Sequence, residues 1–212
     1  MPHWGDEQAG LRAWGPWLIL RYMAIFRRRM LWLGFGLSLA CVAQAVDLAD
    51  RLKDGKHVLL MRHAYAPGVG DPPGYSLERC ETQRNLNEEG RSQARRAGRW
   101  LRAHGLDRAR VYASPWCRCK ETAQGLDLGE VTVERSLASF FDRPEQAAAS
   151  NRSLQAFIAR RLAQAQGLPL LLVTHHVNIR EFMGRDIGSG DMVLARVDGQ
   201  GRMLSYQIYP SP

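Results

Sequence analysis

Residues 58–62 read VLLMR and are followed directly by His63. A short apolar run that ends at basic side chains is typical of a buried strand whose carboxyl end meets a loop. Two similar runs follow, VYAS at 111–114 and LLLVT at 170–174, and the second ends directly before His175. These apolar runs therefore predict buried strands that carry polar residues at their carboxyl ends.

Helical patterns lie between these apolar runs. Asn87 is placed to cap a helix, and Gly105 is placed to end it. The other expected elements are helices at 115–123, 150–166 and 178–184, a strand at 131–133, and strands at 192–197 and 203–209 joined as a hairpin. Strands that alternate with helices predict an α/β fold, with a mostly parallel sheet covered by helices on both faces and a C-terminal hairpin.

The composition is that of an ordinary globular protein. The 212 residues are 45% hydrophobic and 24% charged, and they include four cysteines. These values exclude a disordered tail protein, a collagen-like chain and a disulfide-dense mini-protein. No sequence period of about 20–50 residues is present, so a repeat array is also excluded.

The first 45 residues have the pattern of an export signal. Arg27–Arg29 form a positive run, the apolar stretch Met30–Val42 follows, and Ala43–Ala45 supplies an A-x-A cleavage site. Residues 1–45 are therefore expected to be an N-terminal extension with a signal peptide, and residues 46–212 a single domain in the periplasm. The alternative is an uncleaved segment that anchors the protein in the inner membrane.

The charge of the expected mature chain points to an anionic ligand. After residue 45 the sequence holds 24 Lys and Arg against 19 Asp and Glu, a net charge of +5. A mild positive charge favours anionic partners. No dense Lys/Arg tract with interleaved aromatic residues is present, so nucleic acid is not an expected partner.

Three cysteines remain after the expected cleavage: Cys80, Cys117 and Cys119. An oxidising compartment permits one disulfide among three thiols and leaves one thiol over. A bridge from Cys80 to Cys117 or to Cys119 is expected, and the alternative is three buried thiols. The spacing of Cys117 and Cys119 is too tight for a zinc C-x-x-C pair.

Basic and imidazole side chains gather at the expected strand ends. Arg62 and His63 follow the first strand, Arg118 follows the second, and His175 follows the fourth. Ligands of such sheets bind beyond the carboxyl ends of the strands. Two arginines and two histidines with no carboxylate nearby in the sequence suit a dianion, most simply a phosphoryl group, and a neutral histidine can attack phosphorus.

Four ordered motifs resemble the histidine phosphatase superfamily, whose fold is phosphoglycerate mutase-like. Leu60–Ala64 (LMRHA) is similar to the R-H-G signature of that superfamily, and Leu86–Ala94 (LNEEGRSQA) is similar to its L-T-x-x-G-x-x-Q-A helix start. Ala113–Ala123 (ASPWCRCKETA) resembles its S-S-P-x-x-R-x-x-x-T-A segment, and Val173–His175 (VTH) resembles its V-x-H. The loop sequences also resemble a small exported bacterial branch that includes lipopolysaccharide core heptose phosphatases.

The resemblance implies a role for each matching residue. His63 would be the nucleophile that becomes phosphohistidine. Arg62, Arg118 and His175 would bind the phosphoryl oxygens and stabilise charge in the transition state. No metal or other cofactor is expected, because these side chains supply the positive charge.

The position of the general acid is where this sequence departs from the pattern of the superfamily. Ser139 falls near the position where an Asp or Glu usually protonates the leaving group. Asp142 is the nearest acid and is the expected donor, with Glu145 next; the alternative is that Asp142 is an ordinary loop acid. His176 stands where many members have glycine, and it is interpreted as a loop residue rather than as a support for the site.

Arg84 is a further candidate for binding the substrate. It lies in the loop before the helix that starts near Asn87, from where it could reach a substrate phosphate or sugar. The alternative is a solvated arginine that pairs with Glu88 or Glu89.

The favoured function is metal-independent hydrolysis of a phosphate ester through phosphohistidine on His63. The expected partner is a phosphorylated small molecule or an envelope glycolipid, such as a cell-envelope phosphosugar. One alternative is a phosphohistidine or phosphoramidate phosphatase, which an invalid export signal would favour. Another is a non-catalytic anion-binding protein.

Overall fold

The computed structural model describes residues 48–164 and 167–212. The expected signal peptide, its alternative as a membrane anchor and its boundary at residue 45 lie outside the described residues. Within the described ranges, no helix has both the length and the apolar character needed to cross a membrane.

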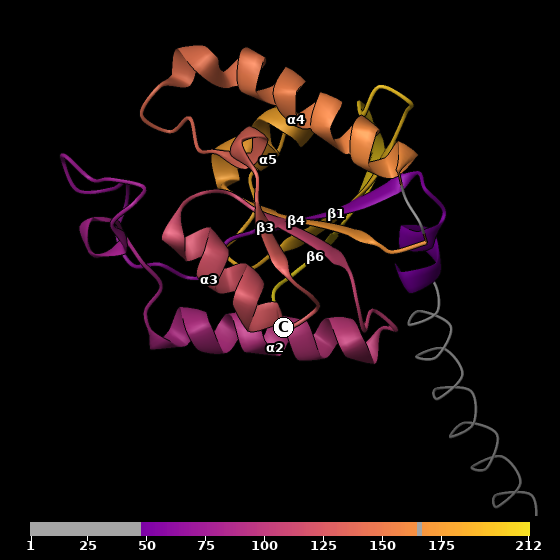
Figure 1. The fold of residues 1–212 in the computed structure, drawn as a ribbon, viewed down its shortest axis with the longest axis horizontal. Helices are drawn as coiled ribbons and strands as arrows, with labels where there is room; N and C mark the ends of the chain where they lie inside the picture. The colour runs from indigo at the N-terminus through magenta and orange to yellow at the C-terminus, as the bar shows by residue number, and fades with distance from the viewer. Residues whose placement is uncertain (1–47, 165–166) are drawn as a thin grey trace, which may run out of the picture. The chain divides into compact units, whose positions relative to one another are not determined.

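A single six-stranded sheet forms the centre of the described domain (Figure 1). Its strands are β1 (His57–Arg62), β2 (Arg110–Ala113), β3 (Val131–Val133), β4 (Leu170–Thr174), β5 (Met192–Val197) and β6 (Met203–Tyr209). They are arranged in the order β3-β2-β4-β1-β5-β6, and the first four are parallel. Strands β5 and β6 are antiparallel and form the expected hairpin. The predicted α/β fold with a mostly parallel sheet is confirmed.

Helices cover both faces of this sheet. They are α2 (Glu88–Ala103), α3 (Cys117–Leu126), α4 (Ala147–Ala163) and α5 (His176–Met183). Figure 1 shows α4 and α5 on one side of the sheet and α2 and α3 on the other. In β1, Leu59 and Met61 pack in one core cluster with α2 and α3, whereas Val58 and Leu60 pack in the other with α4 and α5. The continuous apolar run of β1 therefore reflects burial on both faces.

The helix boundaries differ from the sequence prediction by a few residues. Asn87 caps α2 as predicted, because its side chain accepts a hydrogen bond from Gly90 N at 2.9 Å. Helix α4 begins at Ala147 instead of Ser150, since the 3-10 turn Pro144–Gln146 leads directly into it. Helix α3 begins at Cys117 instead of Pro115, because Trp116 has extended backbone angles and serves as its cap.

The packing of α2 against α3 depends on a glycine. An alanine Cβ at Gly98 would lie 2.2 Å from the carbonyl oxygen of Leu126. Gly98→Ala should therefore lower the free energy of unfolding by about 1–3 kcal/mol, although alanine is intrinsically the better helix former. Urea unfolding would measure the loss. Gly199→Ala is the control, since nothing lies within 4 Å of its added Cβ; equal stability of the two variants would contradict the prediction.

Candidate functional site

His63 lies at the carboxyl end of β1, and it is 1% exposed. Its backbone N–H donates to Thr174 O at 2.9 Å, which joins the loop after β1 to the end of β4. Its ring Nδ1 lies 2.8 Å from the carbonyl oxygen of Ala64. Because a carbonyl only accepts hydrogen bonds, Nδ1 carries the proton and Nε2 keeps its lone pair. The structure thus presents the Nε2 of His63 as a nucleophile.

Burial also keeps the His63 ring neutral. The pKa of His63 is held well below its usual value, first by burial and then by the positive charge of Arg118. Arg84 and Arg62 add to this effect. A neutral imidazole among guanidinium groups has the protonation state that attack on phosphorus requires.

His175 lies beside His63, as the meeting of β1 and β4 predicts. The two ring centroids are 5.5 Å apart. The Nε2 of His175 is hydrogen-bonded to Ser114 Oγ at 2.8 Å, and Cys119 Sγ lies 3.5 Å from the same nitrogen. Burial, followed by the positive charge of Arg118, holds the pKa of His175 well below its usual value. Ser114 therefore orients this ring from the end of β2.

Arg62 and Arg118 each have a buried Nε–H group without a hydrogen-bond partner. Arg62 Nη1 donates to Ile187 O at 2.7 Å, but its buried Nε has no hydrogen-bond partner. The Nε of Arg118 is likewise buried without a partner. Since buried N–H groups are rarely left unsatisfied, two such groups near one nucleophile indicate a site for an anion.

The structure corrects the expectation that no carboxylate lies among these cations. Asp71 forms a bidentate ion pair with Arg118, with Nη1 to Oδ1 at 2.8 Å and Nη2 to Oδ2 at 3.1 Å. Burial opposes ionisation, but the hydrogen bonds from Arg118, from the backbone of Arg84 and from Trp116 lower the pKa of Asp71 below its usual value. Asp71 was not predicted from the sequence, because it lies in a loop and follows none of the expected strands.

Arg84 lies at this site and does not pair with the acids that begin α2. Its Nε donates to Gly70 O at 2.8 Å, and its Nη1 donates to Ala66 O. Glu88 instead accepts hydrogen bonds from Arg91 and Arg95. Arg84 thus adds a third guanidinium near His63.

Asp142 and His176 lie near Phe141, which is 41% exposed. Asp142 is exposed on a turn and accepts a hydrogen bond from the Tyr75 hydroxyl at 3.4 Å. His176 is the first residue of α5, and its ring centroid lies 5.8 Å from that of Phe141. The role of Asp142 as general acid stays a prediction.

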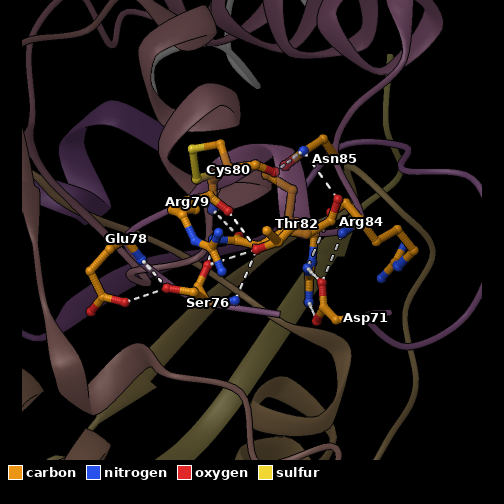
Figure 2. The surroundings of a disulfide bond; sticks show 11 residues. Asp71, Ser76, Glu78, Arg79, Cys80, Thr82, Arg84 and Asn85 are labelled. Atoms are coloured by element: carbon orange, nitrogen blue, oxygen red, sulfur yellow. Dashed lines mark hydrogen bonds and ion pairs between the residues drawn. A yellow bond between two sulfur atoms is a disulfide. The ribbon is translucent and has the colours of Figure 1, made fainter. Parts of the chain in front are cut away.

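A disulfide holds the loop that supplies Asp71 and Arg84. Cys80 is bonded to Cys117, the first residue of α3 (Figure 2). Cys119 is a buried free thiol. The structure therefore selects the first of the two expected bridges. Burial raises the pKa of Cys119 to about 12, so this thiol stays protonated. In the described ranges, no group of three or more His, Cys, Asp or Glu could hold a metal ion.

The two buried histidines predict a pH dependence of stability. A histidine with a pKa lowered in the folded state binds its proton only in the unfolded state between the folded pKa and about 6.5. The free energy of unfolding should therefore fall as pH drops below about 6.5, by up to about 1.4 kcal/mol per pH unit for each of His63 and His175. Urea unfolding between pH 7.5 and 5.5 would measure this slope, and His63→Gln should reduce it. A constant or rising stability over that interval would contradict the prediction.

Comparisons with known proteins give a family match over part of the chain. A model of the histidine phosphatase superfamily (branch 1) matches residues 58–138, which include Arg62, His63 and Arg118. No curated protein has a sequence that matches this chain.

Solved structures of phosphatases resemble the chain at low sequence identity. A mycobacterial glucosyl-3-phosphoglycerate phosphatase is 14% identical, with 73% of this chain and 98% of that one covered and a TM-score of 0.54. A phosphoserine phosphatase from Entamoeba histolytica is 13% identical, with 66% and 89% covered and a TM-score of 0.50. A protein histidine phosphatase solved with tungstate is 19% identical, with 72% and 94% covered and a TM-score of 0.48. The match of the family model makes residues 58–138 of this chain similar to the histidine phosphatase superfamily.

Proposed function

We propose that this protein hydrolyses a phosphate monoester through a phosphohistidine on His63. The observation that carries the proposal is the state of the His63 ring, with Nδ1 bound to Ala64 O and Nε2 free among three guanidinium groups. The unpartnered Nε atoms of Arg62 and Arg118 supply donors for the phosphoryl oxygens. His175 adds a further group beside the nucleophile.

The reaction has two displacements at phosphorus. In the first, the lone pair of His63 Nε2 forms the P–N bond while the P–O ester bond breaks. The leaving oxygen takes a proton, for which Asp142 is our proposed donor. The phosphorylated ring is cationic because Nδ1 keeps its proton, and the Ala64 carbonyl stabilises that proton. In the second displacement, water forms the new P–O bond and gives a proton to Asp142, which the first step left deprotonated. The P–N bond breaks, its electron pair returns to His63 Nε2, and phosphate leaves.

The proposed substrate is a cell-envelope phosphosugar, and the proposed location is the periplasm. The export pattern of residues 1–45 supports the location. The Cys80–Cys117 disulfide supports it as well, because structural disulfides persist mainly in oxidising compartments. Fusion of residues 1–50 to a reporter that works only outside the cytoplasm tests export. Lack of a signal would favour the phosphohistidine alternative.

Trapping the intermediate tests the mechanism. The purified protein, treated with a chelator, is mixed with a radiolabelled aryl phosphate and quenched in alkali, in which phosphohistidine is stable. We expect turnover without added metal and label on the peptide that contains His63. Turnover without labelled enzyme would contradict the covalent route. Phosphate binding without turnover would support the non-catalytic alternative.

A substrate series separates the remaining alternatives. Asp142 is exposed. If it did not act as the donor, leaving groups of low pKa would be favoured, which makes phosphoramidates the second candidate substrate class. The ratio of kcat/KM for a sugar phosphate to kcat/KM for a phosphohistidine peptide is the measurement. A higher value for the sugar phosphate supports our proposal, and a higher value for the peptide favours the alternative.

A further inference from the structure

Asp71 occupies an unusual position for a carboxylate in a site built for an anion. Its side chain is 4% exposed, and that of Arg118 is 3% exposed. Besides the two bonds from Arg118, it accepts Trp116 Nε1 at 3.0 Å and Arg84 N at 3.0 Å. Four donors thus converge on one buried carboxylate. A buried ion pair is retained at a desolvation cost, so its geometry calls for a role.

The pair fixes the direction of the Arg118 guanidinium. Because the group is planar, bonds at both Nη atoms set its plane and leave Nε as the free donor. That Nε is buried and has no partner. Asp71 therefore binds the two Nη atoms of Arg118 and leaves its Nε available to the phosphoryl group.

A disulfide and several hydrogen bonds hold the loop around Asp71 in place. These contacts argue against a role in which Asp71 occupies the anion site and moves away when phosphate binds. The Cys80–Cys117 bridge ties the loop to α3, and Gln83 Oε1 accepts Cys117 N at 2.9 Å. The side chain of Arg84 also holds the loop, because it donates hydrogen bonds to the carbonyl oxygens of Gly70 and Ala66. Figure 2 shows Asp71 beside Arg84 in this disulfide-tethered segment.

We infer that Asp71 is a positioning residue that holds Arg118 so that its Nε faces the transferring phosphoryl group. The inference rests on the proposed function, and it adds a member to the site outside the matching motifs. Asp71 also offsets one positive charge among Arg62, Arg84 and Arg118. Its removal should therefore affect the transition state more than it affects the bound ground state.

Asp71→Asn separates these two effects. We expect kcat for an aryl phosphate to fall about 10- to 100-fold, because Arg118 is no longer held at its donor angle. KM should stay the same or fall, because the site gains one unit of positive charge. Asp71→Glu, which restores the charge, should recover part of kcat. Unchanged kcat with a lower KM would overturn the inference and assign Asp71 the role of a competitor for Arg118.

A matched carboxylate controls for structural effects. Asp198 accepts Arg202 Nε at 2.8 Å and two backbone N–H groups in the β5–β6 turn. Asp198→Asn loses a comparable set of bonds and should leave kcat unchanged. The rates are divided by the amount of enzyme that forms trapped phosphohistidine. If Asp71→Asn then has the wild-type kcat per active molecule, its role is structural only, and the inference fails.

Vanadate binding tests the inference independently of turnover. Vanadate can adopt the five-coordinate geometry of the transition state, whereas inorganic phosphate represents the ground state. We expect Asp71→Asn to bind vanadate at least about tenfold more weakly and phosphate equally or more tightly. A wild type that binds both anions without hydrolysing any ester would refute the proposed function and still allow this comparison. Equal losses for the two anions would overturn the inference.

Discussion

Replacing His63 with alanine should lower kcat/KM for an aryl phosphate by at least about 10³-fold, because the reaction loses the atom that forms the covalent bond. The remaining cations still surround the vacated space, so phosphate binding should change by only a few fold. Steady-state assays in the presence of a chelator and calorimetric titration with phosphate measure the two quantities. Loss of rate together with retained binding would identify His63 as the nucleophile.

The control variant is His57→Ala, at the opposite end of the same strand. His57 is hydrogen-bonded to Asp54 at 2.8 Å and lies far along β1 from the site. It should keep wild-type activity. If His63→Ala retained turnover and a labelled phosphoenzyme, another residue would be the nucleophile and the mechanism above would be wrong.

Removal of the Cys80–Cys117 disulfide should cause the largest loss of stability. The two cysteines are 37 residues apart, and a loop of that length corresponds to about 4 kcal/mol of chain entropy in the unfolded state. Domains of this size are stable by only about 5–15 kcal/mol. The double variant Cys80→Ser with Cys117→Ser should therefore have a urea midpoint far below that of the oxidised wild type.

Reduction provides the matched comparison for this variant. Dithiothreitol should lower the stability of the wild type to about the level of the double variant, and it should leave the double variant unchanged. A wild type that is equally stable with and without reductant would show that the bridge contributes nothing. Because the bridge braces the Asp71 loop, we also expect the reduced protein to have a lower kcat.

The strands could be predicted well from the sequence, because each is apolar and bounded by turn residues. The expected ranges 131–133, 170–174, 192–197 and 203–209 are those observed. Helix starts were less predictable. Serine is a common cap, so the sequence predicts that α4 starts at Ser150, but the 3-10 turn at Pro144–Gln146 leads directly into the helix at Ala147.

The site was predictable where the fold brings strand ends together. His63 and His175 follow neighbouring strands, so parallel pairing places them side by side. Asp71 was not predictable by this route, because the loop from residue 64 to residue 87 has no hydrophobic period that fixes its path. A usable signal was the place of Arg118 shortly after an apolar strand, since a guanidinium that becomes buried requires an acceptor.

The central position of β4 has a consequence for the order in which the chain assembles. Strand β1 lies between β4 and β5, and both of these neighbours come from the last third of the sequence. Ser114 likewise meets His175 only after β4 has entered the sheet. Contacts between such distant segments form late and slowly during folding. A chain that is still emerging from the ribosome therefore carries these side chains far apart, and the candidate site forms only when folding is almost complete.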